Sequence, residues 1–414
     1  MGMLNEISEF VKAASAAQAK WDYEMSTNII KSRKKLLILM FLLLPILLVS
    51  LTDAGTVLGG KTAYAPSFYT TTIFIVSIAI GVIAGLITGC IGAGGGFIIA
   101  PALMAAGVKG ILAVGTDVFH IFAKAIMGTT VHKKLGNVSF KLAIAFLAGS
   151  AGGTFLGGAI NKGIYKIDPV LSDLFINSVY AVLLGFFGFF ALFDYLKSRN
   201  NTSTGAHGGP VGTTRLAVRM QNINIPPMIT FDEDNVPGGR RISGVFVAIG
   251  GFIVGTVASI MGVGGGFITF PMFVYAFGVS TATTVGTDIL QIIFTAGLAS
   301  IVQYAIYGYV FYTLAMGMLV GSLVGVQVGA LTTKVVKGIQ IRAFFAITII
   351  AGFISRAASL PKKLVELEYI SLAKGTVAGI ELVGNILFWA AVGVFGVWVM
   401  SKFFANWKTL KGEA

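Results

Sequence analysis

The sequence predicts an all-α polytopic membrane protein, and its hydrophobicity, scarcity of charge and glycine content lead to that prediction. Of 414 residues, 56% are hydrophobic, 11% are charged and 54 are glycine, and the mean hydropathy is +0.87. Soluble domains carry about 25% charged residues, which argues against a soluble enzyme, a disordered chain or a disulfide scaffold. Glycine at this frequency lets helices approach closely in lipid.

Apolar segments of about 20 residues, the length that spans a bilayer, follow one another along the chain. We expect membrane helices at 36–51, 70–91, 111–131, 140–161, 173–196, 242–261, 281–306, 310–331, 341–358 and 377–404. Two further apolar segments, Phe97–Val108 and Phe267–Val279, are too short to cross as ordinary helices. Twelve helical residues cover about 18 Å of a hydrocarbon core of about 30 Å, so we expect half-helices there.

These segments and the polar stretches between them suggest six parts. They are a cytoplasmic N-terminal segment (1–35), a first membrane helix with an external loop (36–69), membrane repeat 1 (70–196), a polar cytoplasmic insert (197–241), membrane repeat 2 (242–358), and a loop with a C-terminal membrane helix (359–414). In the insert, apolar and polar residues alternate over 215–225, which predicts a small extended or hairpin element on the membrane surface.

The two hydrophobic groups repeat each other. The stretch 92–101 matches 262–271, and the motif Val-Gly-Thr-Asp occurs at 114–117 and again at 285–288. If both short segments cross the membrane, the Lys/Arg-rich loops all fall on one side, as expected of cytoplasmic loops. Each repeat then has five passes, so the repeats are predicted to be inverted. Inverted repeats with interrupted helices are typical of secondary transporters.

The net charge of +13 is explained by these basic loops, so no nucleic-acid partner is expected. The chain contains one cysteine and three scattered histidines, without the spacing of metal ligands and without a visible catalytic triad. We therefore expect neither an enzyme nor a bound metal or cofactor.

The glycine runs at 92–96 and 262–266 look superficially like a dinucleotide fingerprint. Phe97 and Phe267 occupy the position where that fingerprint needs glycine or alanine, so nucleotide binding is rejected. Consecutive glycines unwind a membrane helix, and the N–H groups that begin the next half-helix form a ready anion site. Close glycine packing without a ligand is the alternative.

Ionisable residues at membrane depth are costly and are candidates for function. Asp117, His120 and Lys124 share one helical face, and their counterparts in repeat 2 are Asp288, Gln291 and Thr295. Three interpretations remain open. In the first, Asp117 forms an ion pair with Lys124. In the second, His120 and Lys124 neutralise an anionic substrate while a carboxylate carries a proton. In the third, the two Gly-Thr-Asp motifs bind Na⁺. Asp288 has no basic neighbour in its own helix, which makes it a candidate proton carrier.

The duplicated pattern Gly-x-Gly-Gly-Gly-Phe…Pro, followed by Gly-Val, Val-Gly-Thr and a Gly-x-Val turn, resembles the sulfite exporter TauE/SafE family. The resemblance implies a membrane permease with two homologous halves that moves sulfite, sulfonates or related small anions. It also implies substrate-lining residues, namely Gly92, Gly94, Gly95, Gly96 and Thr116 with Gly262, Gly264, Gly265, Gly266 and Thr287. We add Phe97, Phe267 and Gln291 to this set. Many relatives have a small residue where this chain has Asp117 and Asp288.

The function expected from the sequence is a secondary transporter that exports a small sulfur-containing anion across the inner membrane, coupled to protons, with a cytoplasmic N-terminus. Asp117, His120, Lys124 and Asp288 are its predicted coupling and charge residues. The alternatives are a passive anion channel and a Na⁺-coupled transporter of another small solute. The expected partners are the small anion, protons and the lipid bilayer, and a homo-oligomer is left open.

Overall fold

The computed structural model describes residues 71–91, 95–134, 138–198, 214–232, 238–333, 335–336 and 338–407. All of them belong to one compact unit that comprises residues 61–414. The predicted N-terminal segment (1–35) and first membrane helix (36–51) lie outside the described residues.

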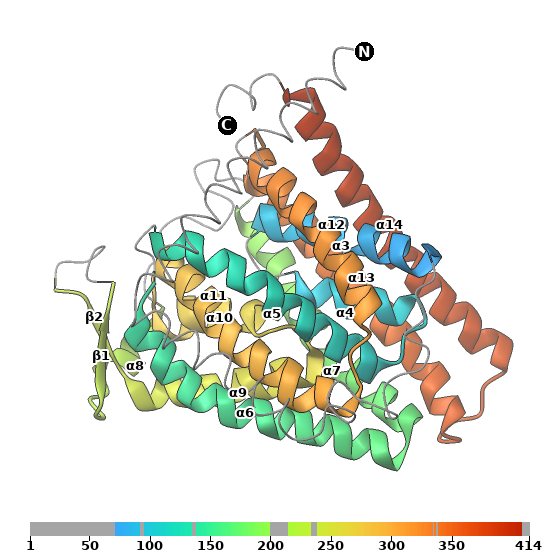
Figure 1. Cartoon of the computed structure of the whole chain (residues 1–414), viewed down its shortest axis with the longest axis horizontal. Helices are drawn as coiled ribbons and strands as arrows, with labels where there is room; N and C mark the ends of the chain where they lie inside the picture. Colours follow the sequence, from blue (N-terminus) through green and yellow to red (C-terminus); the bar gives the residue numbers. More distant parts are fainter. Residues whose placement is uncertain are drawn as a thin grey trace, which may run out of the picture. The chain divides into compact units, whose positions relative to one another are not determined.

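Helices make up nearly all of the described chain (Figure 1). Repeat 1 contains α3 (Thr71–Ile91), α4 (Gly96–Ala105), α5 (Gly110–Lys134), α6 (Phe140–Ile167) and α7 (Pro169–Ser198). Repeat 2 contains α9 (Gly244–Met261), α10 (Gly266–Pro271), the π-helix η2 (Met272–Phe277), α11 (Thr281–Leu298), the π-helix η3 (Ala299–Tyr304), the short η4 (Ala305–Tyr307), α12 (Tyr312–Thr332) and α13 (Gly338–Glu366). The chain continues into α14 (Lys374–Ala405).

Seven of the described helices are long and apolar enough to cross a membrane. The chain is therefore an all-α polytopic membrane protein, as predicted. The two predicted short segments are also short helices: α4 has ten residues with Pro101 inside it. Its counterpart α10 ends at Pro271 and continues as π-helix. A proline removes a backbone donor and crowds the preceding turn, which favours such irregular helix.

The two repeats are interlocked by glycine faces. The most extensive helix contacts join α3 of repeat 1 to α12 of repeat 2, and α6 of repeat 1 to α9 of repeat 2. In α6, a Cβ on Gly153 would lie 2.1 Å from the carbonyl oxygen of Phe252 in α9. In α12, a Cβ on Gly325 would lie 2.2 Å from the carbonyl oxygen of Val82 in α3. Much of the glycine surplus therefore serves close helix packing.

The order of contacts gives the relative directions of these helices. Along α6 and α9, Gly149 lies against Ala248 and Gly157 against Thr256, so the two helices run parallel. Along α12 and α3, Gly317 lies against Ser77, whereas Gly329 lies against Leu86 twelve residues later in α12. The helices α3 and α12 therefore run parallel as well.

The helix α5 runs in the same direction as α12. Thr116 contacts Phe311, just before α12 begins. One turn later in α5, His120 contacts Ser322 in the middle of α12. Asn161 near the end of α6 and Gly115 near the beginning of α5 both contact Tyr304, so α6 runs in the direction opposite to α5.

The polar insert differs from its predicted conformation. Residues 215–225 were expected to be extended, but Arg215–Asn222 form the helix α8, so that prediction is wrong. The side chain of Thr214 accepts a hydrogen bond from the backbone N–H of Ala217 and so caps this helix. A hairpin does follow, in which β1 (Met228–Phe231) pairs antiparallel with β2 (Arg240–Ser243).

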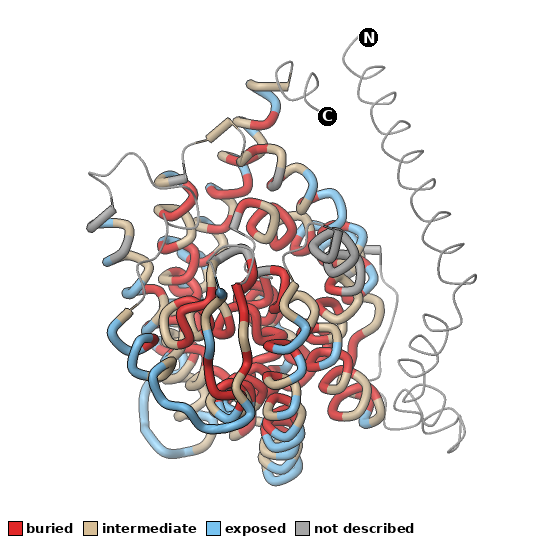
Figure 2. The backbone as a smooth tube through the Cα atoms, turned by 90° about the vertical axis from the view of Figure 1, so that its left-hand side faces the viewer, coloured by how far each residue is buried: buried red, intermediate tan, exposed pale blue. Residues whose placement is uncertain are grey.

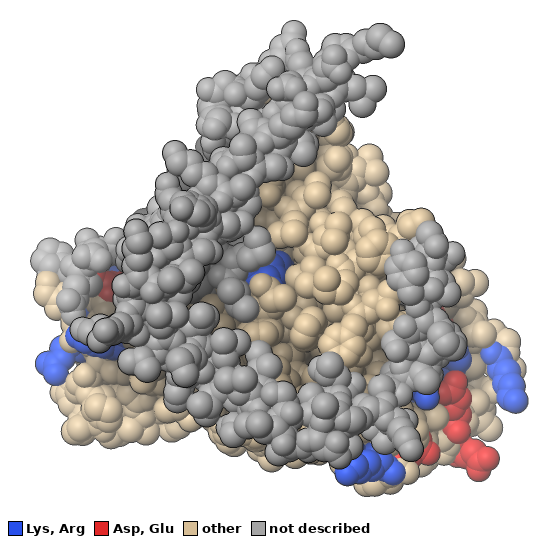
Figure 3. Space-filling model, viewed as in Figure 1, with Lys and Arg blue, Asp and Glu red and all other residues tan. Residues whose placement is uncertain are grey.

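Burial divides the described chain into a packed interior and an apolar surface. Buried residues concentrate in the centre, and exposed ones lie along the outer helix faces and at the helix ends (Figure 2). The exposed set contains many large apolar side chains, among them Phe186, Phe189 and Phe193 on one face of α7. Charged side chains on the view in Figure 3 gather mostly near its margins, as expected of a lipid-facing surface.

Candidate functional site

The two glycine-led short helices meet in the interior. Gly95 precedes α4 with a φ of 72°, and Gly265 precedes α10 with a φ of 93°. These are left-handed or similar conformations that side chains other than glycine rarely adopt. The rings of Phe97 and Phe267 stack with their centroids 4.9 Å apart. The predicted residues Gly92 and Gly94 lie outside the described residues.

Three of the described glycines of the runs are packed tightly against the opposite repeat, and the others pack against their own repeat. A Cβ on Gly96 would lie 3.0 Å from the Cα of Val263, so the two runs touch directly. A Cβ on Gly262 would lie 2.7 Å from the carbonyl oxygen of Val114, and one on Gly264 would lie 2.5 Å from Ile121. Close packing accounts for the absence of side chains here, and a role in binding an anion remains a prediction.

Three consecutive backbone carbonyls at the end of α9 accept hydrogen bonds from side chains. The hydroxyl of Tyr304 donates to Ser259 over 2.6 Å, the amide of Asn161 donates to Ile260 over 2.9 Å, and the hydroxyl of Tyr180 donates to Met261. Asn161 also donates to the Tyr304 hydroxyl over 2.9 Å. Helix ends at membrane depth need such partners because water is absent.

Asn161, Tyr180 and Tyr304 are functional candidates that the sequence pattern did not indicate. They come from α6, α7 and η3, and they support the helix end directly before the glycine run of repeat 2. An asparagine inside an apolar segment is the feature that could have indicated this role.

The two predicted threonines occupy equivalent positions and make equivalent bonds. The Thr116 hydroxyl accepts a hydrogen bond from the backbone N–H of Phe311 over 2.8 Å. The Thr287 hydroxyl accepts one from the backbone N–H of Ser139 over 3.0 Å. Each threonine thus links its own repeat to the residue that precedes a long helix of the other repeat, α12 or α6. Their contact with a substrate remains a prediction.

In repeat 1, the structure brings the predicted ionisable residues together on α5. Asp117 and His120 have exposed fractions of 0%, and the atoms Oδ1 of Asp117 and Nδ1 of His120 are 3.9 Å apart. Neither carboxylate oxygen of Asp117 makes a hydrogen bond of normal geometry with the described residues. The other ring nitrogen of His120 lies 2.9 Å from the hydroxyl of Ser322. Lys124, which is half-buried, donates to the hydroxyl of Thr88 over 3.1 Å.

In repeat 2, the corresponding residues form a hydrogen-bonded chain on α11. The amide of Gln291 donates to Asp288 over 2.7 Å, and the hydroxyl of Thr295 lies 3.0 Å from the side-chain oxygen of Gln291. The second oxygen of Asp288 lies against Gly266, where a Cβ would be 2.9 Å from it. The carboxylate of repeat 2 is therefore fixed by a hydrogen bond, whereas that of repeat 1 interacts with neighbouring charged or ionisable groups, His120 and Lys124.

A buried arginine connects α14 to the repeats. Arg356 in α13 is 2% exposed. Its guanidinium donates to Asn177 in α7 over 3.2 Å, to Asn385 in α14 over 3.2 Å and to Ser355 over 2.7 Å. Arg356 was not among the predicted site residues, although an arginine inside the apolar segment 341–358 is as unusual as the predicted ionisable residues.

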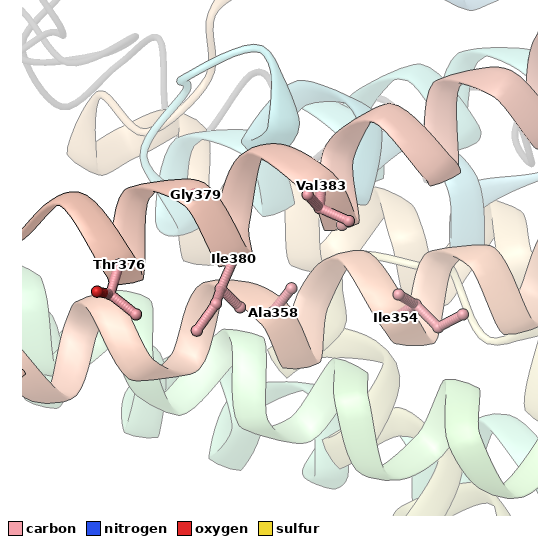
Figure 4. A pocket seen from close by; sticks show the side chains of 7 residues that line it. Ile354, Ala358, Thr376, Gly379, Ile380 and Val383 are labelled. Atoms are coloured by element: carbon pink, nitrogen blue, oxygen red, sulfur yellow. The ribbon is translucent and has the colours of Figure 1, made fainter.

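Two other features lie apart from the predicted site. A groove of about 490 Å³ runs between α13 and α14, and its lining is apolar apart from Thr376 (Figure 4). None of the residues that line it belongs to the predicted set. Within the described part of the chain, no three His, Cys, Asp or Glu side chains are grouped closely enough to hold a metal ion.

A polytopic helical bundle with broken, glycine-led helices at its centre is typical of membrane transporters. The family model of the sulfite exporter TauE/SafE matches residues 77–356. The chain therefore belongs to the TauE/SafE family, as the duplicated glycine pattern predicted.

Curated relatives agree with this class. The probable membrane transporter protein YunE of Bacillus subtilis is 26% identical over 266 residues, which cover 62% of this chain and 87% of the relative. A probable membrane transporter protein of Xylella fastidiosa is 24% identical, with coverages of 62% and 84%. The probable membrane transporter protein ORF9 of a Sinorhizobium species is 33% identical over 167 residues, with coverages of 40% and 61%. No solved structure shows a significant match.

Proposed function

We propose that this protein is a secondary transporter, and not an enzyme, that exports a small sulfur-containing anion such as sulfite or an organosulfonate. The family description supplies the class of substrate. The observation that carries the proposal is the pair of glycine-led short helices, α4 and α10, which begin side by side in the protein interior. The beginnings of helices direct N–H groups and a positive dipole end toward the space before them, which favours an anion there.

The anion site lies between these two helix beginnings in our proposal. In this structure, the two glycine runs touch each other and leave no room for a side chain between them. The halves must therefore move apart for a substrate to enter, as alternating access requires. Rigid repeats that rock about such a site would expose it to one membrane face at a time.

The helix directions support inverted repeats. The helix α6 runs opposite to α5, and α5 runs with α12 and α3. The helix α9, which begins repeat 2, runs with α6. The first helices of the two repeats, α3 and α9, therefore run in opposite directions, as in an inverted duplication. With Lys/Arg-rich loops on the cytoplasmic side, the N-terminus is cytoplasmic and the protein resides in the inner membrane.

Proton coupling is assigned to Asp117 in our proposal. Asp117 is fully buried, and among the described residues its charge is balanced only by His120 and Lys124 nearby, so a carboxylate in this environment is suited to exchanging a proton during transport. The neighbouring His120 contacts Asp117 on one side and Ser322 on the other, which suits a relay of that proton. Asp288 is held by Gln291 and is the weaker candidate.

The test is transport by the purified protein in proteoliposomes loaded with sulfite, thiosulfate or sulfoacetate. We expect efflux of at least one anion that increases when a proton gradient is imposed. The absence of flux for all three under every gradient would refute the proposed substrate class. A flux that ignores the proton gradient and far exceeds the turnover of a carrier would indicate a channel instead.

The coupling residue is tested by comparing Asp117→Asn with Asp288→Asn in the same vesicles. We expect Asp117→Asn to abolish the response to the proton gradient while anion exchange without a gradient persists. Asp288→Asn should keep the response. If Asp117→Asn responds to the gradient as the unmodified protein does, Asp117 is not the proton carrier, whatever the substrate.

A further inference from the structure

The helix α8 of the insert attaches to the end of the broken helix of repeat 2 by one of its faces. Ala217 on this face is fully buried. The side chain of Thr214 donates to the carbonyl oxygen of Tyr275, and Gln221 donates to that of Phe277 over 2.7 Å. The hairpin makes a similar contact, because Arg240 donates to the carbonyl oxygen of Gly278.

The opposite side of α8 is exposed and combines apolar with basic residues. Leu216 is 54% exposed and Val218 is 42% exposed. Arg215 and Arg219 lie between them around the helix, and both are exposed. These arginines are the only charged residues of α8. An apolar and cationic surface on a helix is the composition of elements that lie in the membrane interface.

The position of α8 along the chain places it at the membrane surface. The insert follows directly from α7, whose face with Phe186, Phe189 and Phe193 is exposed and apolar. Its hairpin leads without a linker into α9, because Ser243 ends β2 and also caps α9. Tyr275, to which α8 is attached, packs its ring on Phe190 of α7 with centroids 5.6 Å apart. The helix α8 is therefore attached beside the apolar, exposed helix α7.

We propose that the exposed surface formed by Arg215, Leu216, Val218 and Arg219 is a binding surface for anionic phospholipid. The apolar pair enters the boundary between headgroups and acyl chains, and the two arginines bind lipid phosphates. Because the other face of α8 holds Tyr275 and Phe277, lipid binding is linked to the position of the broken helix of repeat 2.

The test uses the fact that Cys90 is the sole cysteine of the chain. Cys90→Ala provides a background in which Leu216→Cys can be labelled with a fluorophore, and the full chain is then reconstituted in vesicles. One set of vesicles contains phosphatidylcholine alone, and the other contains phosphatidylcholine with 30% phosphatidylglycerol, an amount on the order of that in natural anionic membranes. Quenching by nitroxide lipids is compared with quenching by a water-soluble nickel chelate.

We expect lipid-borne nitroxides to quench the label more strongly in anionic vesicles, and we expect added salt to reduce this difference. The double variant Arg215→Gln/Arg219→Gln should remove the dependence on phosphatidylglycerol. Arg241→Gln, which removes an exposed charge from β2 of the same insert, is the matched control and should retain it.

Two results would overturn the proposal. Equal quenching by the aqueous chelate in both kinds of vesicle would show that this surface faces water. Protection from both quenchers, increasing with the amount of protein per vesicle, would show that another protein chain covers it. Both results are independent of the transported substrate, so they leave the proposed transport function untouched.

Discussion

The substitution Gly153→Ala tests whether glycine faces hold the two repeats together. Its Cβ would lie 2.1 Å from the carbonyl oxygen of Phe252, whereas ordinary contact begins at 3.4 Å, so α6 and α9 must separate locally by about 1.3 Å. Overpacking of this kind costs about 1–3 kcal/mol. The same substitution stabilises the helix by about 0.5–1 kcal/mol, because alanine has a higher helix propensity than glycine. We therefore expect a net loss of up to about 2.5 kcal/mol.

The adjacent Gly152→Ala is the matched control. Its Cβ would meet the ring of Phe252 at 3.6 Å, an ordinary contact, on the exposed side of the same helix. Only the propensity gain applies there, so stability should rise by about 0.5–1 kcal/mol. Gly325→Ala in α12 should lose about as much as Gly153→Ala, because its Cβ would lie 2.2 Å from Val82.

The assay is thermal unfolding of the purified protein in a mild detergent, followed by tryptophan fluorescence. The midpoints for Gly153→Ala and Gly325→Ala should fall, and that for Gly152→Ala should stay or rise. If Gly153→Ala unfolds at the same temperature as Gly152→Ala or above it, the glycine faces do not determine the contact between the repeats.

The same unfolding assay addresses three polar contacts. Thr116→Val removes the acceptor for the buried N–H of Phe311 and should cost about 1–3 kcal/mol of stability. Thr116→Ser keeps the hydroxyl and should retain stability. Equal unfolding midpoints for the two variants would contradict the role of the Thr116 hydroxyl as this acceptor. Asn161→Leu deprives the carbonyl of Ile260 of its side-chain donor and should cost a similar amount, and an unchanged midpoint would contradict this role of Asn161. Arg356→Lys replaces the two guanidinium nitrogens that donate to Asn177 and Asn385 with a single ammonium and should cost about 1.5–3 kcal/mol. An unchanged midpoint would exclude Arg356 as the link to α14.

The sequence predicted most of the fold because hydropathy and repetition are local properties. Most membrane helices from α3 to α14 lie within a few residues of the predicted segments, although α6 and α13 extend six and eight residues beyond them, and the glycine runs marked both broken helices. The insert was the exception. Alternation over 215–225 indicated an extended segment, but the Thr214 cap and the contact of Ala217 with the bundle favour a helix.

The candidate site was less predictable because it depends on which helices pair. The sequence marked Asp117 and Asp288 as equivalents, yet only the folded chain places Gln291 on one carboxylate and leaves the other without a normal hydrogen bond. Asn161 and Tyr180 are isolated polar residues in the sequence. Their common role follows from the meeting of α6, α7 and the end of α9.

The interlocked repeats have a consequence for how the protein is made. The helix α3 packs on α12, and the hydrogen bond from Cys90 to Gly329 joins residues 239 positions apart. At about 5–20 residues per second, a ribosome needs about 12–50 s to synthesise that interval. During this time α3 resides in the membrane with its glycine face covered only by lipid or by other factors. Biogenesis must therefore keep the first half of the chain from pairing wrongly until the second half has been inserted.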